Sequence, residues 1–242
     1  MRPLPCLATL TLPALLAMAL GCSSKQGTSA AGGGLAGTPQ NQVDGGGVVY
    51  PAANLGTSQR GLDPGGVPKT IPGSVIQDFK FLGYPGADVS KGLQTIALSD
   101  YYDPTASKHK VLHLIAAASW CVDCISEMSA LSTALATPAT DYAAQGVVYL
   151  EVLIEGVAPN IGATQQDLND WIGKEHPPFT VALDPEAREL GVFFDATAVP
   201  FNADIDVRSM EVLQAGTGRE DPSAVAVWLD WVSKNPPAYA RP

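Results

Sequence analysis

Two cysteines separated by two residues, Cys121 and Cys124, are the residues of this chain best suited to chemistry. They follow the apolar run Val111–Ala118, which has the length of a strand. They precede Ile125–Leu135, whose apolar residues recur at helical spacing. A strand, a Cys-x-x-Cys pair and a helix in this order are typical of a dithiol redox site. The pair therefore predicts thiol–disulfide chemistry.

Cys121 is predicted to be the attacking thiol of the pair, and Cys124 to be the thiol that resolves the mixed disulfide. Cys121 falls at the start of the predicted helix, where unpaired N–H groups and the positive end of the helix dipole favour a thiolate. Cys124 lies about one helical turn further in, from where a thiol can attack a mixed disulfide and release the substrate. The disulfide of the pair is itself the redox group, so no cofactor is expected.

A zinc site and an inert structural disulfide are the two alternatives for the Cys-x-x-Cys pair. Zinc usually takes four ligands, commonly from a second pair. Cys6 and Cys22 lie in the leader, however, and the histidines are not spaced as a ligand pair (His109, His113 and His176). We therefore expect no metal. A disulfide that closes so short a loop constrains the chain little, which disfavours a purely structural bridge.

The N-terminus has the features of an export signal. Residues 1–21 begin with Arg2 and continue with an apolar stretch too short for a comfortable membrane span, which predicts a signal peptide. Ala19-Leu20-Gly21-Cys22 resembles a bacterial lipobox, which implies cleavage before Cys22 and a lipid on its side chain. The expected location is the cell envelope, facing the periplasm and anchored to a membrane by this lipid. Ser23 is compatible with the outer membrane, and the alternative is a soluble secreted protein.

Residues 22–70 differ in composition from the rest of the chain. Gly, Ser, Ala, Thr, Gln and Pro dominate this segment, so it is predicted to be a flexible tether. We expect that it can be removed without unfolding the residues after it. Residues 71–242 are long enough for one domain with a full hydrophobic core.

The chain is acidic, with a formal net charge of −10 at pH 7. Its basic residues form no patch, whereas nucleic-acid-binding proteins usually present one. A nucleic acid is therefore not expected as a partner.

Apolar residues and turn formers in the domain predict strands that alternate with helices. Thr164 and Asp167 have the spacing of a capping box at the start of one helix. Strands that alternate with helices, followed by a hairpin and a helix, imply an α/β sandwich around a mixed sheet. Strands are expected at Val75–Tyr84, Leu93–Asp100, Lys110–Ala117, Gly146–Ile154, Phe179–Leu183, Phe201–Asp206 and Glu211–Ala215, and helices at Ile125–Leu135, Thr164–Trp171, Asp184–Leu190 and Pro222–Val232.

Residues 72–235 resemble the thioredoxin fold, and in particular the exported, membrane-anchored thioredoxin-like proteins of the TlpA and cytochrome c-maturation type. The resemblance rests on Trp120–Cys124, on Glu127 three residues after the second cysteine, and on Val199-Pro200 followed by Ile205-Asp206. It implies a mixed central sheet flanked by helices, with an added N-terminal hairpin.

The resemblance also assigns roles to individual residues. Cys121 would be the nucleophile and Cys124 the resolving thiol. Pro200 would be a cis-proline that faces the cysteines, and Val199 would offer its backbone to an extended substrate peptide by strand addition. Trp120 is expected to cover the dithiol.

Three departures from the family pattern concern the chemistry. The dipeptide between the cysteines, Val122-Asp123, contains no proline, and Ser129 replaces a helix proline found in many members. Ile115 stands where thioredoxin has a buried acidic residue. Glu127 could substitute for that acid as a proton relay. A solvated position in the first turn, favoured by the helix dipole, is the simpler expectation for Glu127.

These observations together predict an extracytoplasmic thiol–disulfide oxidoreductase, acting as a reductase of protein disulfides. Its partners would be protein thiols and disulfides of the cell envelope and an unknown electron donor. One alternative is a redox-inactive lipoprotein that uses the fold as a binding module. Another is a thiol peroxidase, although Ala118-Ser119-Trp120-Cys121 lacks the threonine of the Thr-x-x-Cys site of peroxiredoxins.

Overall fold

The computed structural model describes six stretches of the chain, and all of them belong to one compact unit, Pro39–Pro242. The predicted signal peptide, Cys22 and most of the predicted tether lie outside these stretches. Across the described residues, none of the helices has both the length and the apolar character to cross a bilayer. The described stretches are 42–43, 49–53, 61–62, 68–69, 72–192 and 198–237.

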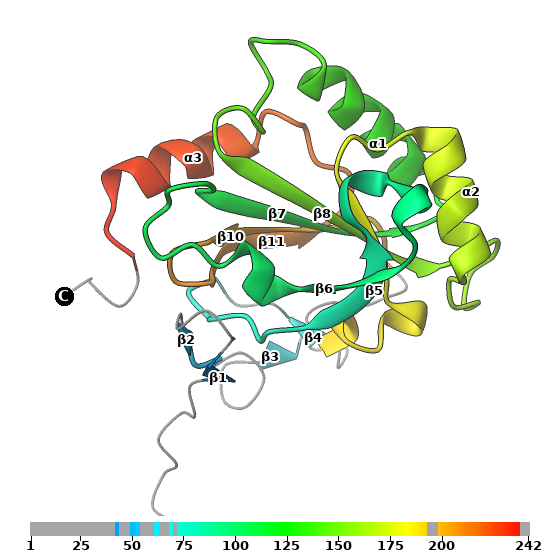
Figure 1. Cartoon of the computed structure of the whole chain (residues 1–242), viewed down its shortest axis with the longest axis horizontal. Helices are drawn as coiled ribbons and strands as arrows, with labels where there is room; N and C mark the ends of the chain where they lie inside the picture. The colour runs from blue at the N-terminus through cyan, green and yellow to red at the C-terminus, as the bar shows by residue number, and fades with distance from the viewer. Residues whose placement is uncertain are drawn as a thin grey trace, which may run out of the picture. The chain divides into compact units, whose positions relative to one another are not determined.

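A seven-stranded mixed sheet forms the centre of this unit (Figure 1). The strand order is β11-β10-β7-β8-β9-β5-β6. The three middle strands β7, β8 and β9 run parallel, and the pairs at both edges are antiparallel. The strands are β5 (Lys80–Tyr84), β6 (Gln94–Ala97), β7 (Val111–Ala118), β8 (Val147–Glu155), β9 (Thr180–Leu183), β10 (Phe201–Asp206) and β11 (Glu211–Thr217).

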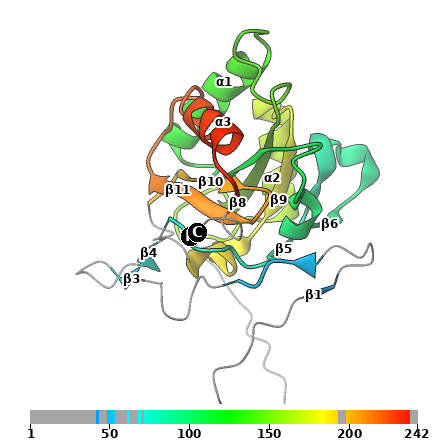
Figure 2. The same cartoon turned by 90° about the vertical axis from the view of Figure 1, so that its left-hand side faces the viewer.

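The α-helices of the described residues are three, and they pack on one face of the sheet (Figures 1 and 2). They are α1 (Val122–Leu135), α2 (Gln165–Glu175) and α3 (Val225–Lys234). The crossovers β7-α1-β8 and β8-α2-β9 advance in the same direction across the sheet. Right-handed crossovers must then place both helices on the same side. The predicted capping box is confirmed, because Thr164 and Asp167 cap α2 reciprocally.

Irregular segments and short 3₁₀-helices cover the other face of the sheet. They include η3 (Leu98–Tyr101), η4 (Pro185–Ala187) and η5 (Leu190–Val192). The prediction of one helix over Asp184–Leu190 is therefore wrong, because two short 3₁₀-helices form there instead. Glu186 has φ of 62°, a left-handed conformation that an α-helix does not accommodate.

The expected fold class is confirmed. β5 and β6 form the predicted N-terminal hairpin, and they add to the sheet beside β9. β7 is buried along its whole length, as its apolar sequence predicts. The strand expected from Val75 begins only at Lys80, because Val75 itself makes an isolated bridge to Glu211.

The segment before the sheet contains two short antiparallel pairs, and one of them carries a core residue. β1 (Gln42–Val43) pairs with β2 (Val49–Tyr50), and β3 (Gly61–Leu62) pairs with β4 (Pro68–Lys69). Tyr50 is buried in the core on the face opposite the α-helices.

Tyr50 is held by specific contacts as well as by burial. Its hydroxyl donates to the carbonyl oxygen of Ile76 at 3.0 Å, and its ring packs edge-on against Tyr102 at 5.7 Å. Part of the segment predicted to be a tether thus contributes to the domain core. This differs from the expectation that the whole segment is dispensable.

Tyr50→Ala is expected to lower the free energy of unfolding by about 3–5 kcal/mol, because it empties a buried aromatic site. Tyr50→Phe should cost only about 1 kcal/mol, since it removes the hydrogen bond and keeps the ring. A chain that starts at Ile71 should melt at a lower temperature than one that starts at Val48. Equal melting temperatures for these two truncations would show that Tyr50 adds nothing to the core.

Candidate active site

The dithiol lies at the junction of β7 and α1, two elements that Figure 1 labels. Cys121 is the N-cap residue of α1, and its Sγ accepts the backbone N–H of Cys124 at 3.1 Å. Both cysteines are free thiols. The first cysteine therefore lies where sequence analysis places it, at a helix N-terminus whose N–H groups stabilise a thiolate.

The two thiols are almost equally buried, with Cys121 4% and Cys124 2% exposed. The exposed fractions of the two thiols therefore do not show which is the nucleophile and which is the resolving thiol. Burial raises the pKa of the Cys124 thiol far above its ordinary value, and its hydrogen bond with Cys121 adds to the rise. Cys124 is thus held as a neutral thiol, which suits a resolving group.

Alkylation of the reduced protein near neutral pH is expected to label Cys121 before Cys124. The reason is that thiolates react and Cys124 is held protonated. Mass spectrometry of peptides after brief iodoacetamide treatment checks this order. Faster labelling of Cys124 would reverse the assignment of nucleophile and resolving thiol.

The Val199–Pro200 peptide bond is cis, in agreement with the expectation. It immediately precedes β10 and lies against the dithiol, because Cys121 Sγ donates to the carbonyl oxygen of Val199 at 3.6 Å. Cys121, Val199 and Pro200 are therefore brought together as the sequence predicts.

Trp120 is half-buried beside the dithiol, and a buried carboxylate fixes its ring. Its indole N–H donates to Glu155 Oε2 at 2.8 Å. The other oxygen, Glu155 Oε1, accepts the backbone N–H of Asn160 at 2.9 Å. Glu155 is a positioning residue that sequence analysis did not identify.

Glu127 is buried under α1, at 4% exposure, and is not a solvated first-turn residue. The simpler expectation from the sequence is therefore wrong. Glu127 Oε1 accepts from the side chain of Asn202 at 3.0 Å and from the backbone N–H of Glu220. Asn202 is in β10 and Glu220 follows β11. Their contact with α1 could not be predicted from the sequence alone. Burial raises the pKa of Glu127.

Polar residues flank Ile115, the position that carries the buried acid in thioredoxin. Asn202 of β10 is paired with Ile115 on one side, and Glu151 of β8 is paired with it on the other. All three belong to the face of the sheet that packs against α1. Glu151 therefore supplies an acidic side chain one strand away from Ile115, which occupies the position of the buried acid in thioredoxin.

Glu151 is 1% exposed, and its Oε2 accepts the indole N–H of Trp171 at 2.9 Å. Burial raises its pKa to about 8, and the carboxylates of Glu127 and Glu175 add to the rise. The charged form of Glu151 in turn raises the pKa of Cys124. Glu151 is therefore electrostatically linked to the resolving thiol, and it titrates in a range useful for proton transfer.

This polar layer was not predicted, although the sequence contains a signal for it. Charged residues are rarely fully buried unless they are paired. One ionisable residue within an otherwise apolar strand is therefore informative. The residues that carry this signal are His113 in β7 and, apart from Glu155 at the end of the strand, Glu151 in β8.

Comparison with protein-family models and with curated proteins finds no match. Solved structures do match. A thiol:disulfide interchange protein, DsbE, from Chlorobium tepidum superposes with a TM-score of 0.51 at 22% sequence identity, over 68% of this chain and 99% of that one. The chain has the thioredoxin fold.

Two further solved structures are similar at lower TM-scores. The exposed lipoprotein thioredoxin of Streptococcus pneumoniae has a TM-score of 0.47 and 24% identity, over 64% of this chain and 99% of that one. A secreted thiol-disulfide isomerase from Corynebacterium glutamicum has a TM-score of 0.47 and 15% identity, over 71% of this chain and 89% of that one. At these identities, similarity establishes the fold alone.

Proposed function

We propose that this protein is a thiol–disulfide oxidoreductase that reduces protein disulfides. The observation that carries the proposal is the environment of Cys121. This thiol caps α1, accepts the N–H of Cys124 and faces the carbonyl of Val199 beside cis-Pro200. A nucleophilic thiol, a resolving thiol and a backbone edge for a substrate thus meet at one point.

The reaction follows from this arrangement. The Cys121 thiolate attacks one sulfur of a substrate disulfide, so that a mixed disulfide forms and the other substrate sulfur leaves as a thiolate. Cys124 then loses its proton and attacks the Cys121 sulfur. The mixed disulfide breaks, the second substrate thiol is released, and the Cys121–Cys124 disulfide remains. The substrate gains two electrons, and an upstream dithiol donor must return them.

The proposed substrates are protein disulfides of the cell envelope. We expect the backbone of Val199 to pair with an extended peptide, which would give binding with little sequence selectivity. The lipobox-like Cys22 and the export signal support an extracytoplasmic, lipid-anchored protein. Two similar structures belong to proteins described as an exposed lipoprotein and as secreted. Extraction of the full-length protein into detergent and metabolic labelling with palmitate test the anchor.

The proposed reducing direction rests on the residues between the cysteines. Asp123 is exposed in the first turn of α1, so this dipeptide brings a negative charge and no cation close to Cys121. Strong oxidants of this fold stabilise their reduced form as a thiolate. We therefore expect a reduction potential on the order of −220 to −270 mV. Equilibration with glutathione or dithiothreitol measures it.

Asp123→His is expected to make that potential more oxidising, because an imidazolium stabilises the thiolate. Asp123→Asn, which removes the charge without adding a cation, should give an intermediate value. A wild-type potential above about −150 mV would contradict the reductase assignment and support an oxidase.

Insulin reduction in the presence of dithiothreitol tests the activity itself. Acceleration over dithiothreitol alone supports the proposal. Lack of acceleration, with the Cys121–Cys124 pair shown to be reduced by dithiothreitol, would support the binding module. Consumption of hydrogen peroxide without insulin reduction would support the thiol peroxidase. Glu127 as a proton relay stays a prediction, and nothing in this proposal depends on it.

A further inference from the structure

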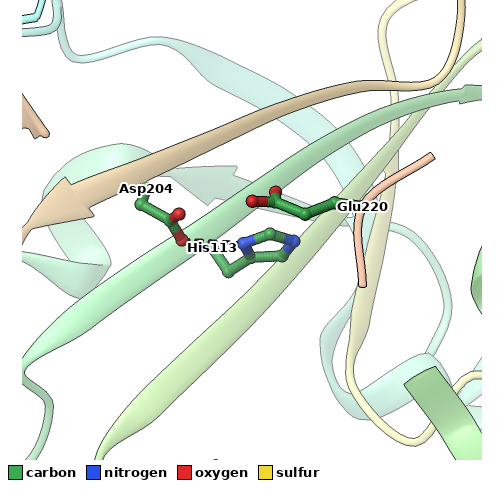
Figure 3. Close-up of side chains that lie close together, drawn as sticks. All are labelled: His113, Asp204 and Glu220. Carbon is green, nitrogen blue, oxygen red and sulfur yellow. Dashed lines mark hydrogen bonds and ion pairs between the residues drawn. The ribbon is translucent and has the colours of Figure 1, made fainter. Parts of the chain in front are cut away.

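Figure 3 shows a cluster of ionisable side chains that includes neither cysteine. It lies on the face of the sheet that α1 and α3 cover. His113 is on β7, Asp204 is on the neighbouring strand β10, and Glu220 lies between β11 and α3. Both carboxylates are turned toward the imidazole. One donor atom from each side chain lies within 4.8 Å of the others, and Asp204 Oδ1 is 2.8 Å from His113 Nδ1.

Buried polar atoms around this cluster lack hydrogen-bond partners among the described residues. They include Glu127 Oε2 and Asp204 Oδ2, and the hydroxyl of Tyr149. Asp204 is 1% exposed, so water does not reach it from outside. A buried acceptor without a partner is costly. These unpaired oxygens therefore indicate that a water molecule or an ion binds among them.

The space available is that of a single small species. A cavity of about 10 Å³ is lined on its polar side by His113, Glu127, Tyr149, Glu220 and Asp221. This is close to the smallest volume that holds one water molecule. A single ion fits this space, and an organic ligand does not.

The charge around the cavity is unbalanced. Three carboxylates, those of Glu127, Asp204 and Glu220, converge on one imidazole. Among the described residues that line the cavity, His113 alone carries a basic side chain. The guanidinium of Arg219, adjacent in sequence, donates instead to Ser126 Oγ at 2.7 Å. Buried charges are normally paired or bind a metal, so a cation is favoured over a water molecule.

We propose that His113, Asp204 and Glu220 bind a divalent transition-metal ion of the zinc type, with Glu127 as a fourth ligand. Imidazole nitrogen together with carboxylate oxygen suits Zn²⁺, whereas Mg²⁺ and Ca²⁺ prefer oxygen ligands alone. Ligand atoms about 2.0–2.2 Å from zinc lie about 3.4 Å apart in a tetrahedral site. The donor atoms of His113, Asp204 and Glu220 lie within 4.8 Å of one another, so small side-chain shifts bring them to this spacing.

This ligand set explains why the histidine spacing in the sequence predicts no metal. One ligand comes from each of four segments, β7, α1, β10 and the β11–α3 connection. The nearest two of these ligands in sequence, His113 and Glu127, are 14 residues apart (127 − 113). The ion would join these four segments and thereby stabilise the domain.

Calorimetric titration of the oxidised protein with Zn²⁺ tests the site, because the Cys121–Cys124 disulfide removes the thiols from competition. We expect one Zn²⁺ per chain and a melting temperature that rises with Zn²⁺ and falls with chelator. Mg²⁺ should not compete. Co²⁺ bound in place of Zn²⁺ should give a visible spectrum without a sulfur-to-cobalt charge-transfer band.

Glu220→Gln is the informative variant, since Glu220 is only half-buried and its loss should not prevent folding. It should weaken zinc binding at least about tenfold, and His113→Gln should do the same. Glu189→Gln makes the same change at an exposed glutamate that does not line the cavity, and it is the matched control, which should bind as the wild type does. Equal binding by all variants would show adventitious surface binding and overturn the proposal. So would absence of binding by the folded wild-type protein.

Discussion

Cys121→Ser is expected to abolish insulin reduction, leaving only the rate of dithiothreitol alone. Serine cannot form the mixed disulfide that begins the reaction, although it can still cap α1. Ser129→Ala, an exposed change on the same helix, is the matched control and should keep full activity. Retention of activity by Cys121→Ser would remove the basis of the proposed function.

Cys124→Ser should have a different phenotype from Cys121→Ser, and the difference tests the two roles. The Cys121 thiolate can still attack a substrate, but no second thiol is present to resolve the product. A mixed disulfide with the substrate should therefore accumulate and appear as a larger species on non-reducing gels. Dithiothreitol should release it. Accumulation in Cys121→Ser instead would assign the roles in the opposite order.

Glu151→Gln is expected to stabilise the protein at alkaline pH and to have little effect near pH 5. The pKa of Glu151 is about 8 in the folded protein, because burial disfavours its charge, and about 4.5 when unfolded. Between these values the folded state binds more protons than the unfolded state. The free energy of unfolding therefore falls as pH rises from about 4.5 to about 8. The total fall from this one group is on the order of 3–5 kcal/mol.

Urea denaturation at several pH values measures this effect. The advantage of Glu151→Gln over the wild type should grow through that range and level off above it, since the amide oxygen can still accept from Trp171. Glu189→Gln, an exposed substitution of the same kind, is the control and should follow the wild type. A pH-independent difference between Glu151→Gln and the wild type would show that Glu151 does not titrate as described.

The same variant provides a functional readout. Charged Glu151 disfavours the Cys124 thiolate, so resolution of a mixed disulfide at pH above about 8 should be faster in Glu151→Gln. Single-turnover release of a fluorescent thiol, followed against pH, separates this effect from stability. Glu151→Asp should restore the wild-type pH dependence in part.

The central strands and the dithiol junction could be predicted from sequence because they depend on local patterns. An apolar run such as Val111–Ala118 predicts a buried strand, and a Cys-x-x-Cys pair before an amphipathic segment predicts a helix N-terminus. Cys121 and Cys124 lie where these patterns place them. Val199 and Pro200 could be assigned only by resemblance, because their contact with Cys121 crosses 78 residues of sequence.

The polar layer under α1 could not be predicted in the same way, because strand register creates it. Which residues flank Ile115 depends on how β8 and β10 align with β7, and apolar patterns do not determine that alignment. Glu127 illustrates the consequence. The position of Glu127 in the first half of α1 favours an exposed side chain. In the structure, Asn202 and the connection after β11 cover this side chain. Tyr50 was missed because an aromatic residue in a glycine-rich segment has no periodic neighbours.

Hydrogen bonds join the turn that contains the cysteines to the end of β8 and the loop after it. Ser119 binds this loop through its backbone N–H to Glu155 O and through its hydroxyl to Gly156 O. Glu155 holds the Trp120 indole and the Asn160 backbone with its two oxygens. A change of length in residues 156–163 would therefore be transmitted to the indole beside the dithiol. Natural or engineered variation of substrate preference could thus arise in a loop that contains neither cysteine and leaves the redox pair intact.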